Sequence, residues 1–160
     1  MINLLEIEKN FLIPHIKKGG VAVDFTMGNG HDTLWLSEAM GENGKVYAFD
    51  IQPQALESSR KLLEASGAAP NYTLILDSHS NVMDYVKEKI CIGMFNLGFL
   101  PGGDKSITTK RDTTMIAIRA QAGSASPADI VLPVLISTLA AGLTGIALCK
   151  FFSSRSKTHA

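Results

Sequence analysis

Cysteine is scarce in this sequence, and so is any excess of one charge. The 160 residues include two cysteines, Cys91 and Cys149, and 15 basic side chains balance 15 acidic ones. Both cysteines lie in apolar runs without the paired spacing to histidine that a zinc site uses, so neither a disulfide framework nor a metal site is indicated. Neutrality gives no electrostatic argument for or against a nucleic acid as partner. The length predicts one domain of ordinary size.

A secretory signal is also lacking. The first nine residues, Met-Ile-Asn-Leu-Leu-Glu-Ile-Glu-Lys, carry acids and no basic region, so they do not form a signal peptide. Together with the scarcity of cysteine, this predicts a cytoplasmic protein.

One long stretch lacks charge altogether. Residues 130–149 contain no charged side chain and are followed by Lys150, Arg155 and Lys157. Their length meets the criterion for a membrane-spanning helix, in which proline and glycine are tolerated. The stretch is equally compatible with a buried helix, and the flanking charges do not choose an orientation in a bilayer. We expect an apolar C-terminal helix and leave both environments open, with membrane association through 130–149 as one of them.

Short apolar runs alternate with segments of helical periodicity over the first hundred residues. Helical segments of about ten residues between strands imply parallel pairing through crossovers. The pattern therefore predicts an α/β fold, a doubly wound parallel sheet. The expected strands are 21–25, 45–50, 72–76 and 90–96, and the expected helices are 3–18, 32–40, 53–65 and 81–89.

The stretch from Val21 to Thr33 has the order of a strand, a tight turn and a helix start. Gly28 and Gly30 lack a Cβ, so the backbone can turn sharply and a ligand can approach it closely. The N–H groups at the start of the helix favour electron-rich partners. The two glycines are half of a dinucleotide fingerprint, because Thr33 stands where a third glycine is expected. The turn from Thr26 to Gly30 is therefore a candidate nucleotide-binding loop.

Polar residues follow each of the four expected strands. They are Asp24, Asp50, the sequence Asp77-Ser78-His79, and Asn96. In a doubly wound sheet a ligand lies outside the carboxyl ends of the strands, so these residues are expected around one crevice. Asp50 comes 20 residues after Gly30, where a carboxylate accepts hydrogen bonds from ribose hydroxyls. Ile51 and Gln52 supply an apolar surface and an amide for a base.

Two nucleotide cofactors fit these signals. NAD would use the segment from Gly28 to Asp50, which makes an NAD-dependent oxidoreductase one alternative. S-adenosylmethionine is favoured, because there is no third glycine for a pyrophosphate and because Asp24 would suit the positively charged methionine portion. Ser78 and His79 are candidates for contact with the adenine. His31 suits a neutral donor better than a helix-stabilising residue.

The segment Asn96-Leu-Gly-Phe-Leu-Pro-Gly-Gly-Asp follows the fourth expected strand. An asparagine carbonyl, together with backbone carbonyls, can hold an amine by its hydrogens and point its lone pair at a methyl group. Phe99 can stack on a base. Because a sulfonium leaving group is already activated, positioning is most of what such a methyl transfer needs. Asn96, Gly98 and Phe99 are therefore the catalytic candidates.

Four motifs in a fixed order carry a resemblance. They are Asp-Phe-Thr-Met-Gly-Asn-Gly-His-Asp-Thr (24–33), Val-Tyr-Ala-Phe-Asp-Ile-Gln (46–52), Asp-Ser-His-Ser-Asn (77–81) and Phe-Asn-Leu-Gly-Phe-Leu-Pro-Gly-Gly-Asp-Lys-Ser (95–106). With them, residues 1–118 resemble the bacterial rRNA methylase family. Its characterised members are tRNA methyltransferases that convert an aminomethyl-2-thiouridine at the wobble position to its methylaminomethyl form.

The resemblance implies a Rossmann-like methyltransferase that uses S-adenosylmethionine and acts on a tRNA. It also implies that Asn96 and the loop after it face the target amine. The cofactor roles that it implies fall on Asp24, Asn29, His31, Asp32, Asp50, Gln52, Ser78 and His79.

Residues 119–160 depart from that family. Ser-Pro-Ala-Asp-Ile-Val-Leu-Pro-Val-Leu-Ile (126–136) and the basic tail resemble the C-terminal end of spore maturation protein A, a membrane protein. The helix, fifth strand and antiparallel pair of the methylase family are then missing, and the fourth strand is an open edge of a truncated sheet unless the tail covers it. We therefore divide the chain into an incomplete S-adenosylmethionine-binding domain, 1–118, and an apolar helix with a basic tail, 119–160.

This junction leaves two hypotheses from different classes. The first is an N-methyltransferase that acts on tRNA and is impaired by a foreign C-terminus. The second is a membrane-associated fusion with spore maturation protein A whose front domain is inactive. A homodimer is compatible with either hypothesis.

Overall fold

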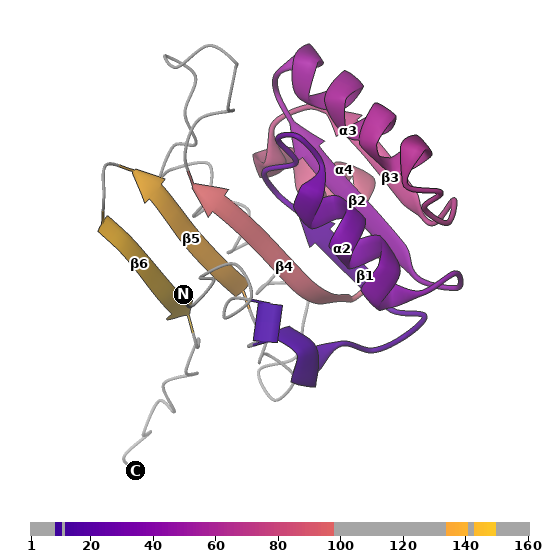
Figure 1. Ribbon diagram of the computed structural model, residues 1–160. Coiled ribbons are helices and arrows are strands. Elements are labelled where there is room, and N and C mark those ends of the chain that lie inside the picture. Colours follow the sequence, from indigo (N-terminus) through magenta and orange to yellow (C-terminus); the bar gives the residue numbers. More distant parts are fainter. Residues whose placement is uncertain (1–8, 11, 98–133, 141–142, 150–160) are drawn as a thin grey trace.

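One mixed sheet holds the strands of the computed structural model (Figure 1). The structure describes residues 9–10, 12–97, 134–140 and 143–149. The strands lie in the order β3-β2-β1-β4-β5-β6, with β6 antiparallel to β5 and the other neighbours parallel. In chain order the elements are η1 (Ile13–His15), β1 (Val21–Asp24), α2 (His31–Met40), β2 (Lys45–Asp50), α3 (Pro53–Ala65), β3 (Tyr72–Leu76), η2 (His79–Asn81), α4 (Val82–Tyr85), β4 (Ile90–Leu97), β5 (Val134–Ala140) and β6 (Leu143–Cys149).

Helices cover both faces of the sheet. On one face, Val46 of β2 packs in a cluster with Leu36 of α2. On the other face, Phe49 of the same strand packs with Val82 of α4. Residues an odd number apart on a strand point to opposite faces, so α2 and α3 lie on one side of the sheet and α4 on the other, as Figure 1 shows. This is the three-layer arrangement of a Rossmann-like α/β fold, as the sequence predicted.

A buried asparagine fixes the end of α2. The side-chain amide of Asn71 donates to the carbonyls of Ser37, at 2.9 Å, and Gly41, at 2.8 Å, and its Oδ1 accepts from Ser37 Oγ at 2.5 Å. Each of these carbonyls also accepts a backbone N–H, Ser37 from Gly41 and Gly41 from Gly44, so Asn71 adds a second hydrogen bond to two backbone groups at the end of the helix. The start of β3 is thereby tied to the end of α2.

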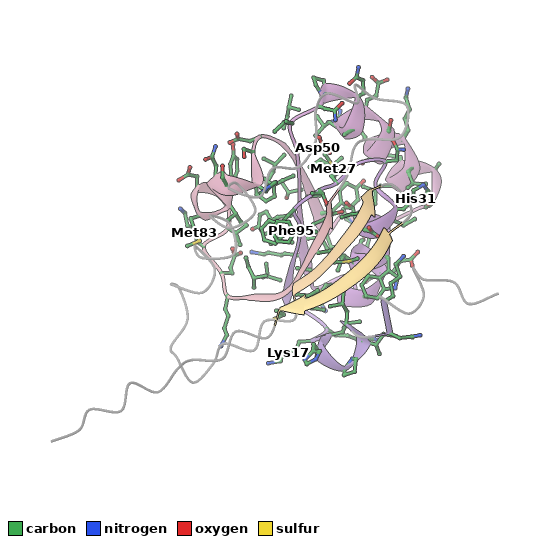
Figure 2. All side chains as sticks on the ribbon, turned by 90° about the vertical axis from the view of Figure 1, so that its left-hand side faces the viewer. Lys17, Met27, His31, Asp50, Met83 and Phe95 are labelled. Carbon is green, nitrogen blue, oxygen red and sulfur yellow. The ribbon has the colours of Figure 1, made fainter. Side chains whose placement is uncertain are left out.

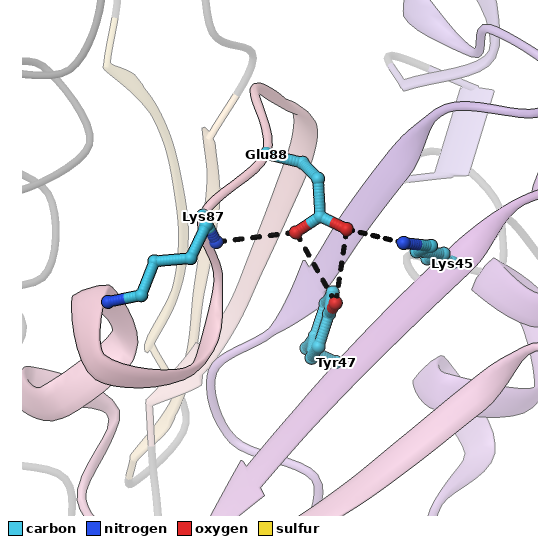
Figure 3. A network of polar contacts seen from close by, with 4 residues as sticks. All are labelled: Lys45, Tyr47, Lys87 and Glu88. Atoms are coloured by element: carbon cyan, nitrogen blue, oxygen red, sulfur yellow. Dashed lines mark hydrogen bonds and ion pairs between the residues drawn. The ribbon is translucent and has the colours of Figure 1, made fainter.

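A polar network fastens the amino-terminal end of β2 to the segment before β4 (Figure 3). Glu88 accepts from Lys45 Nζ at 2.5 Å and from the Tyr47 hydroxyl at 3.4 Å. The backbone N–H of Lys87 also donates to Glu88. Because the Lys45 and Glu88 side chains are 59% and 36% exposed, water screens this ion pair. The pair therefore links the two segments locally and contributes little to stability.

The C-terminal helix predicted for residues 130–149 is wrong, and the fourth strand is not an open edge, because residues of the C-terminal segment cover it. Residues 134–140 form β5, which pairs in parallel with β4 from Gly93↔Val134 to Leu97↔Thr138. Residues 143–149 form β6, antiparallel to β5. A charge-free apolar run does not distinguish a buried helix from buried strands, and its valine, isoleucine and threonine content favours strands.

Strands β5 and β6 continue the sheet beyond β4, so within the described residues the sheet is not truncated after β4. No helix among those residues is long and apolar enough to cross a membrane. The predicted domain boundary at residue 118 lies outside the described residues.

Candidate functional site

The site lies where the strand order changes direction. The chain passes from β1 outward to β2 and β3, and then crosses to β4 on the other side of β1. In a doubly wound sheet, ligands bind outside the carboxyl ends of the strands at this switch point. Met27 and Asp50 lie at this end of the domain, and Lys17 lies at the opposite end (Figure 2). The turn that follows β1, from Thr26 to Gly30, is the part of the site around which the other groups are placed.

Two glycines give this turn its shape. Gly28 has a φ of 54° and Gly30 a φ of 86°, in the left-handed region that side chains with a Cβ rarely adopt. A Cβ on Gly30 would also lie 2.8 Å from the Cα, Cβ and Oγ of Ser59 on α3. The Ser59 hydroxyl donates to the Gly28 carbonyl at 3.1 Å. The turn therefore rests directly on α3, and glycine is required at residue 30 for both conformation and space.

Asp50, at the end of β2, holds the turn from the other side. Its Oδ2 accepts from the backbone N–H of Gly28 at 3.0 Å, and its Oδ1 accepts from the backbone N–H of Gln52 at 3.0 Å. An ionised carboxylate has about four acceptor positions. Two of them position the backbone, so the remaining lone pairs are the ones available to ribose hydroxyls, the role that the sequence predicted for this residue.

Asp24, the last residue of β1, is 1% exposed. It accepts from the backbone N–H of Thr26 at 3.1 Å and from the Thr33 hydroxyl at 2.7 Å. Burial, reinforced by the charge of Asp32, raises the pKa of Asp24 to about 7, although the two hydrogen bonds oppose the rise. A strongly perturbed carboxyl beside a ligand-binding turn is typical of a functional site.

A single hydrogen bond joins the ends of β1 and β4 across the switch point. The backbone N–H of Asn96 donates to Thr26 Oγ1 at 2.6 Å. Asn96 also pairs with Ser137 of β5 in the sheet register. The asparagine is therefore held beside the turn by its backbone, and within the described residues its side-chain amide has no hydrogen bond that would prevent the role in amine binding predicted from the sequence.

Replacing Thr26 with valine is expected to lower the free energy of unfolding by about 1–3 kcal/mol, because the part-buried N–H of Asn96 loses its acceptor while the volume is kept. Thr73→Val, at an exposed position on β3, is the matched control and should change stability by less than about 0.5 kcal/mol. Urea unfolding of both variants measures the difference. Equal values for the two would show that the Thr26 bond does not join the strands.

Two buried polar atoms at the same end of the sheet have no hydrogen-bond partner within the described part of the chain. They are Oε1 of Gln52, whose residue is 5% exposed, and Nε2 of His79, whose residue is 9% exposed. Burial lowers the pKa of His79, so its ring is neutral near pH 7. The ring contacts Phe95 edge to face, with centroids 5.5 Å apart, while Phe95 stacks on Phe25 at 4.1 Å. Buried polar groups in folded proteins are almost always paired, so these two atoms indicate a ligand.

The other predicted site residues differ in their exposure and in their partners. Asn29 is half-buried in the turn, and His31 is exposed at the start of α2. Asp32 lies 3.7 Å from Lys9 Nζ in an ion pair. The Ser78 hydroxyl lies 2.8 Å from that of Ser80 and caps η2. Gly98 and Phe99, predicted as catalytic residues, lie outside the described residues.

Thr33 and Ser59 contribute to the site although the sequence did not single them out for it. Thr33 ties the first turn of α2 to Asp24, and Ser59 supports the glycine turn. The sequence could have indicated Thr33, because it occupies the position of the third glycine in the dinucleotide fingerprint. Ser59 shares the inward face of α3 with Ala55 and Leu63 at a spacing of four residues, and a serine on such a face indicates a close backbone contact.

These features define a Rossmann-like α/β domain with a candidate ligand site at the carboxyl ends of β1, β2 and β4. A family model described as "Putative rRNA methylase" matches residues 46–136, and the chain belongs to this family. The resemblance seen in the four motifs is thereby confirmed. The matched range includes residues 126–136, on which the resemblance to spore maturation protein A was based, and that second resemblance stays a prediction.

Individual relatives agree with this assignment. The chain is 40% identical over 126 residues to a chloroplastic tRNA (mnm(5)s(2)U34)-methyltransferase from Arabidopsis thaliana, a match that covers 72% of this chain and 46% of that protein. It is similar to a solved rRNA-methylase from Clostridium thermocellum, with 36% identity, a TM-score of 0.74, and coverage of 86% of this chain and 72% of the other. A methyltransferase from Streptococcus mutans, solved in complex with SAH, has 38% identity, a TM-score of 0.72, and coverage of 85% and 72%. The chain thus spans less than half the length of the plant relative.

Proposed function

We propose that this chain is a methyltransferase that uses S-adenosylmethionine and acts on RNA. Membership of the rRNA methylase family supports the reaction class. The Streptococcus mutans relative holds SAH, which is what S-adenosylmethionine becomes when its methyl group is lost. The observation that carries the proposal for this chain is the convergence of Asp24, Asp50 and Asn96 on one glycine turn through hydrogen bonds of 2.6–3.1 Å.

The described residues fit this cofactor. The unpaired acceptors Gln52 Oε1 and His79 Nε2 suit the polar edge of an adenine base. Asp50 keeps lone pairs for the ribose hydroxyls, and the turn at Gly28 and Gly30 lets a ligand approach the backbone. Asp24 is the acid available to the positively charged methionine portion.

S-adenosylmethionine supplies an activated methyl group, which passes to a nucleophilic nitrogen as sulfur takes the C–S electron pair. The residues of the chain then have a positioning task. Thr26 holds the backbone of Asn96 at the switch point. The amide oxygen of Asn96 accepts a hydrogen bond from an N–H of the attacking amine, so that the nitrogen lone pair points toward the methyl group. The amine gives up its proton to water after the transfer.

The specific substrate that we propose is the aminomethyl group of a wobble uridine in tRNA. The 40% identity to the plant tRNA (mnm(5)s(2)U34)-methyltransferase supports this substrate. An amine substrate also fits the site because a neutral amine is nucleophilic without a strong general base. Asn96 is the residue of the described part that would bind this amine, and Gly98 and Phe99 complete the proposed catalytic set.

Calorimetric titration with S-adenosylmethionine, and then methyl transfer to tRNA that carries 5-aminomethyl-2-thiouridine, test the two levels of the proposal separately. We expect binding of S-adenosylmethionine in preference to NAD, and methylation of the aminomethyl tRNA but not of tRNA that is already methylated there. Preferential binding of NAD would support an oxidoreductase instead. Binding of S-adenosylmethionine without methyl transfer would support the proposed cofactor but contradict the proposed tRNA substrate.

Asn96→Ala is expected to lower kcat for methyl transfer on the order of a hundredfold while cofactor affinity stays within about twofold, because the backbone bond to Thr26 is kept. Asn81→Ala is the matched control, since the Asn81 side chain is exposed and bonds only to Asp77 among the described residues. Equal rates for the two variants would remove Asn96 from the catalytic set.

A further inference from the structure

Three carboxylates surround the glycine turn. Asp24 ends β1, Asp32 lies in the first turn of α2, and Asp50 ends β2. The charges of Asp32 and Asp50 both act on Asp24. Concentrated negative charge around a buried acid disfavours its ionisation, unless a cation compensates.

The three carboxylates differ in what satisfies them. Asp32 pairs with Lys9 at 3.7 Å. Asp50 accepts two backbone N–H groups, and it is only half-buried. Asp24 is 1% exposed, and its two partners are a backbone N–H and a hydroxyl, both uncharged. In the part of the chain that the structure describes, no lysine, arginine or histidine forms an ion pair with Asp24.

The hydrogen bonds of Asp24 are compatible with either protonation state. Each oxygen accepts one hydrogen bond, so a lone pair on one of them can carry a proton without displacing a donor. The charged or titratable groups on the surrounding elements are His31 and Asp32 of α2, Asp50 of β2, His79 of η2, and Lys9.

We propose that Asp24 is protonated in the free chain and releases its proton to solvent when a cationic ligand enters the site. The inference rests on the proposed function, because it takes S-adenosylmethionine as the cation. Without the ligand, the proton neutralises the Asp24 carboxylate. With the ligand bound, the positive charge of the ligand balances the carboxylate instead. Asp24 thereby makes binding selective for a ligand of positive charge, beyond the shape of the nucleoside.

The raised pKa of Asp24, about 7, agrees with this geometry and sets the pH range. Below pH 7 a cationic ligand has to displace the proton, so its dissociation constant should fall about tenfold for each unit of pH between about 5.5 and 6.5, and level off above pH 7. Burial lowers the pKa of His79, and any proton that this ring exchanges is also exchanged by Asp24→Asn, so comparing the two chains separates Asp24 from His79.

Calorimetric titration of the intact chain with S-adenosylmethionine, in buffers of different ionisation enthalpy, counts the protons released. At pH 6.0 we expect the count for the wild type to exceed that for Asp24→Asn by about 0.9, and at pH 8.0 the difference should fall to about 0.1. Asp84→Asn changes an exposed acid of α4, and it should behave as the wild type does. If Asp24→Asn binds too weakly, carbon-13 NMR of the Asp24 carboxyl, with and without S-adenosylmethionine, assigns the proton.

A wild-type chain that binds S-adenosylmethionine at pH 6.0 without releasing a proton would overturn the inference and leave the proposed cofactor intact. Release of the same proton by Asp24→Asn would also overturn it, because another group would then be its source. A folded wild-type chain that gives no binding heat at pH 6.0 and at pH 8.0 would instead remove the proposed function on which the inference rests.

Discussion

Replacing Gly30 with alanine is expected to lower the free energy of unfolding by about 3 kcal/mol and to weaken cofactor binding on the order of a hundredfold. A residue with a Cβ at a φ of 86° is strained by about 1–2 kcal/mol. The new Cβ would also stand 2.8 Å from three atoms of Ser59, one of them the backbone Cα, and such overpacking costs about 1–3 kcal/mol. The turn has to move away from α3, and a shift of about 1 Å at a binding site is enough to cost a hundredfold.

Gly67→Ala is the matched control for this change. Gly67 also has a positive φ, 64°, but a Cβ there would meet nothing within 4 Å. Its alanine variant should therefore show the conformational strain alone, about 1–2 kcal/mol, and bind the cofactor normally. Urea unfolding and calorimetric titration of both variants separate strain from steric conflict. Equal losses at the two positions would mean that the turn does not rest on Ser59 as described.

Most of the sheet as far as β4 was predictable because local signals agree with the tertiary fold. The expected helix 53–65 and strand 72–76 coincide with α3 and β3, since Pro53 and Gly67 mark both ends of a periodic segment. The expected helix 81–89 is shorter in the structure, where α4 ends at Tyr85. Glu88 turns back to Lys45 and Tyr47, a tertiary contact that helical periodicity does not reveal.

The C-terminal strands were not predictable in the same way. Residues 130–149 carry no charged side chain, and their few polar residues, Ser137, Thr138 and Thr144, mark neither an alternation nor a helical stripe. The strand that joins β5 to the rest of the sheet is β4, about forty positions earlier in the sequence, and such non-local pairing leaves no local signal. The length of the run met the criterion for a membrane-spanning helix, although valine, isoleucine and threonine in the run indicate strands.

For the candidate site, the sequence indicated which residues the structure brings together better than it indicated the hydrogen bonds between them. Asp24, Asp50 and Asn96 were found because parallel strands bring their carboxyl ends to one edge. What the sequence did not indicate is that Asp50 and Thr26 position backbone groups of the turn and of β4. Those bonds join residues 22 and 70 positions apart, so they depend on the register of the strands, which the sequence alone does not specify.

Replacing Asp24 with asparagine is expected to stabilise the free chain at neutral and alkaline pH while it weakens binding of the cationic cofactor. The folded state raises the pKa of Asp24 from an ordinary 3.8 to about 7, so between these values the folded chain holds a proton that the unfolded chain has lost. Folding therefore becomes less favourable as pH rises through this window, and the cost levels off above pH 7 at about 4 kcal/mol. Asparagine carries no charge, its Oδ1 can still accept from Thr26, and its Nδ2 can donate to Thr33 Oγ1.

The difference in unfolding free energy between Asp24→Asn and the wild type should therefore grow by about 3 kcal/mol from pH 5 to pH 8. Urea unfolding at both pH values measures it, with Asp84→Asn as an exposed control that should show little change. A difference that stays constant with pH would mean that Asp24 is ionised in the free chain throughout. A stabilised variant that binds S-adenosylmethionine more weakly would show that Asp24 is kept for binding at the expense of stability, as expected for a functional carboxylate.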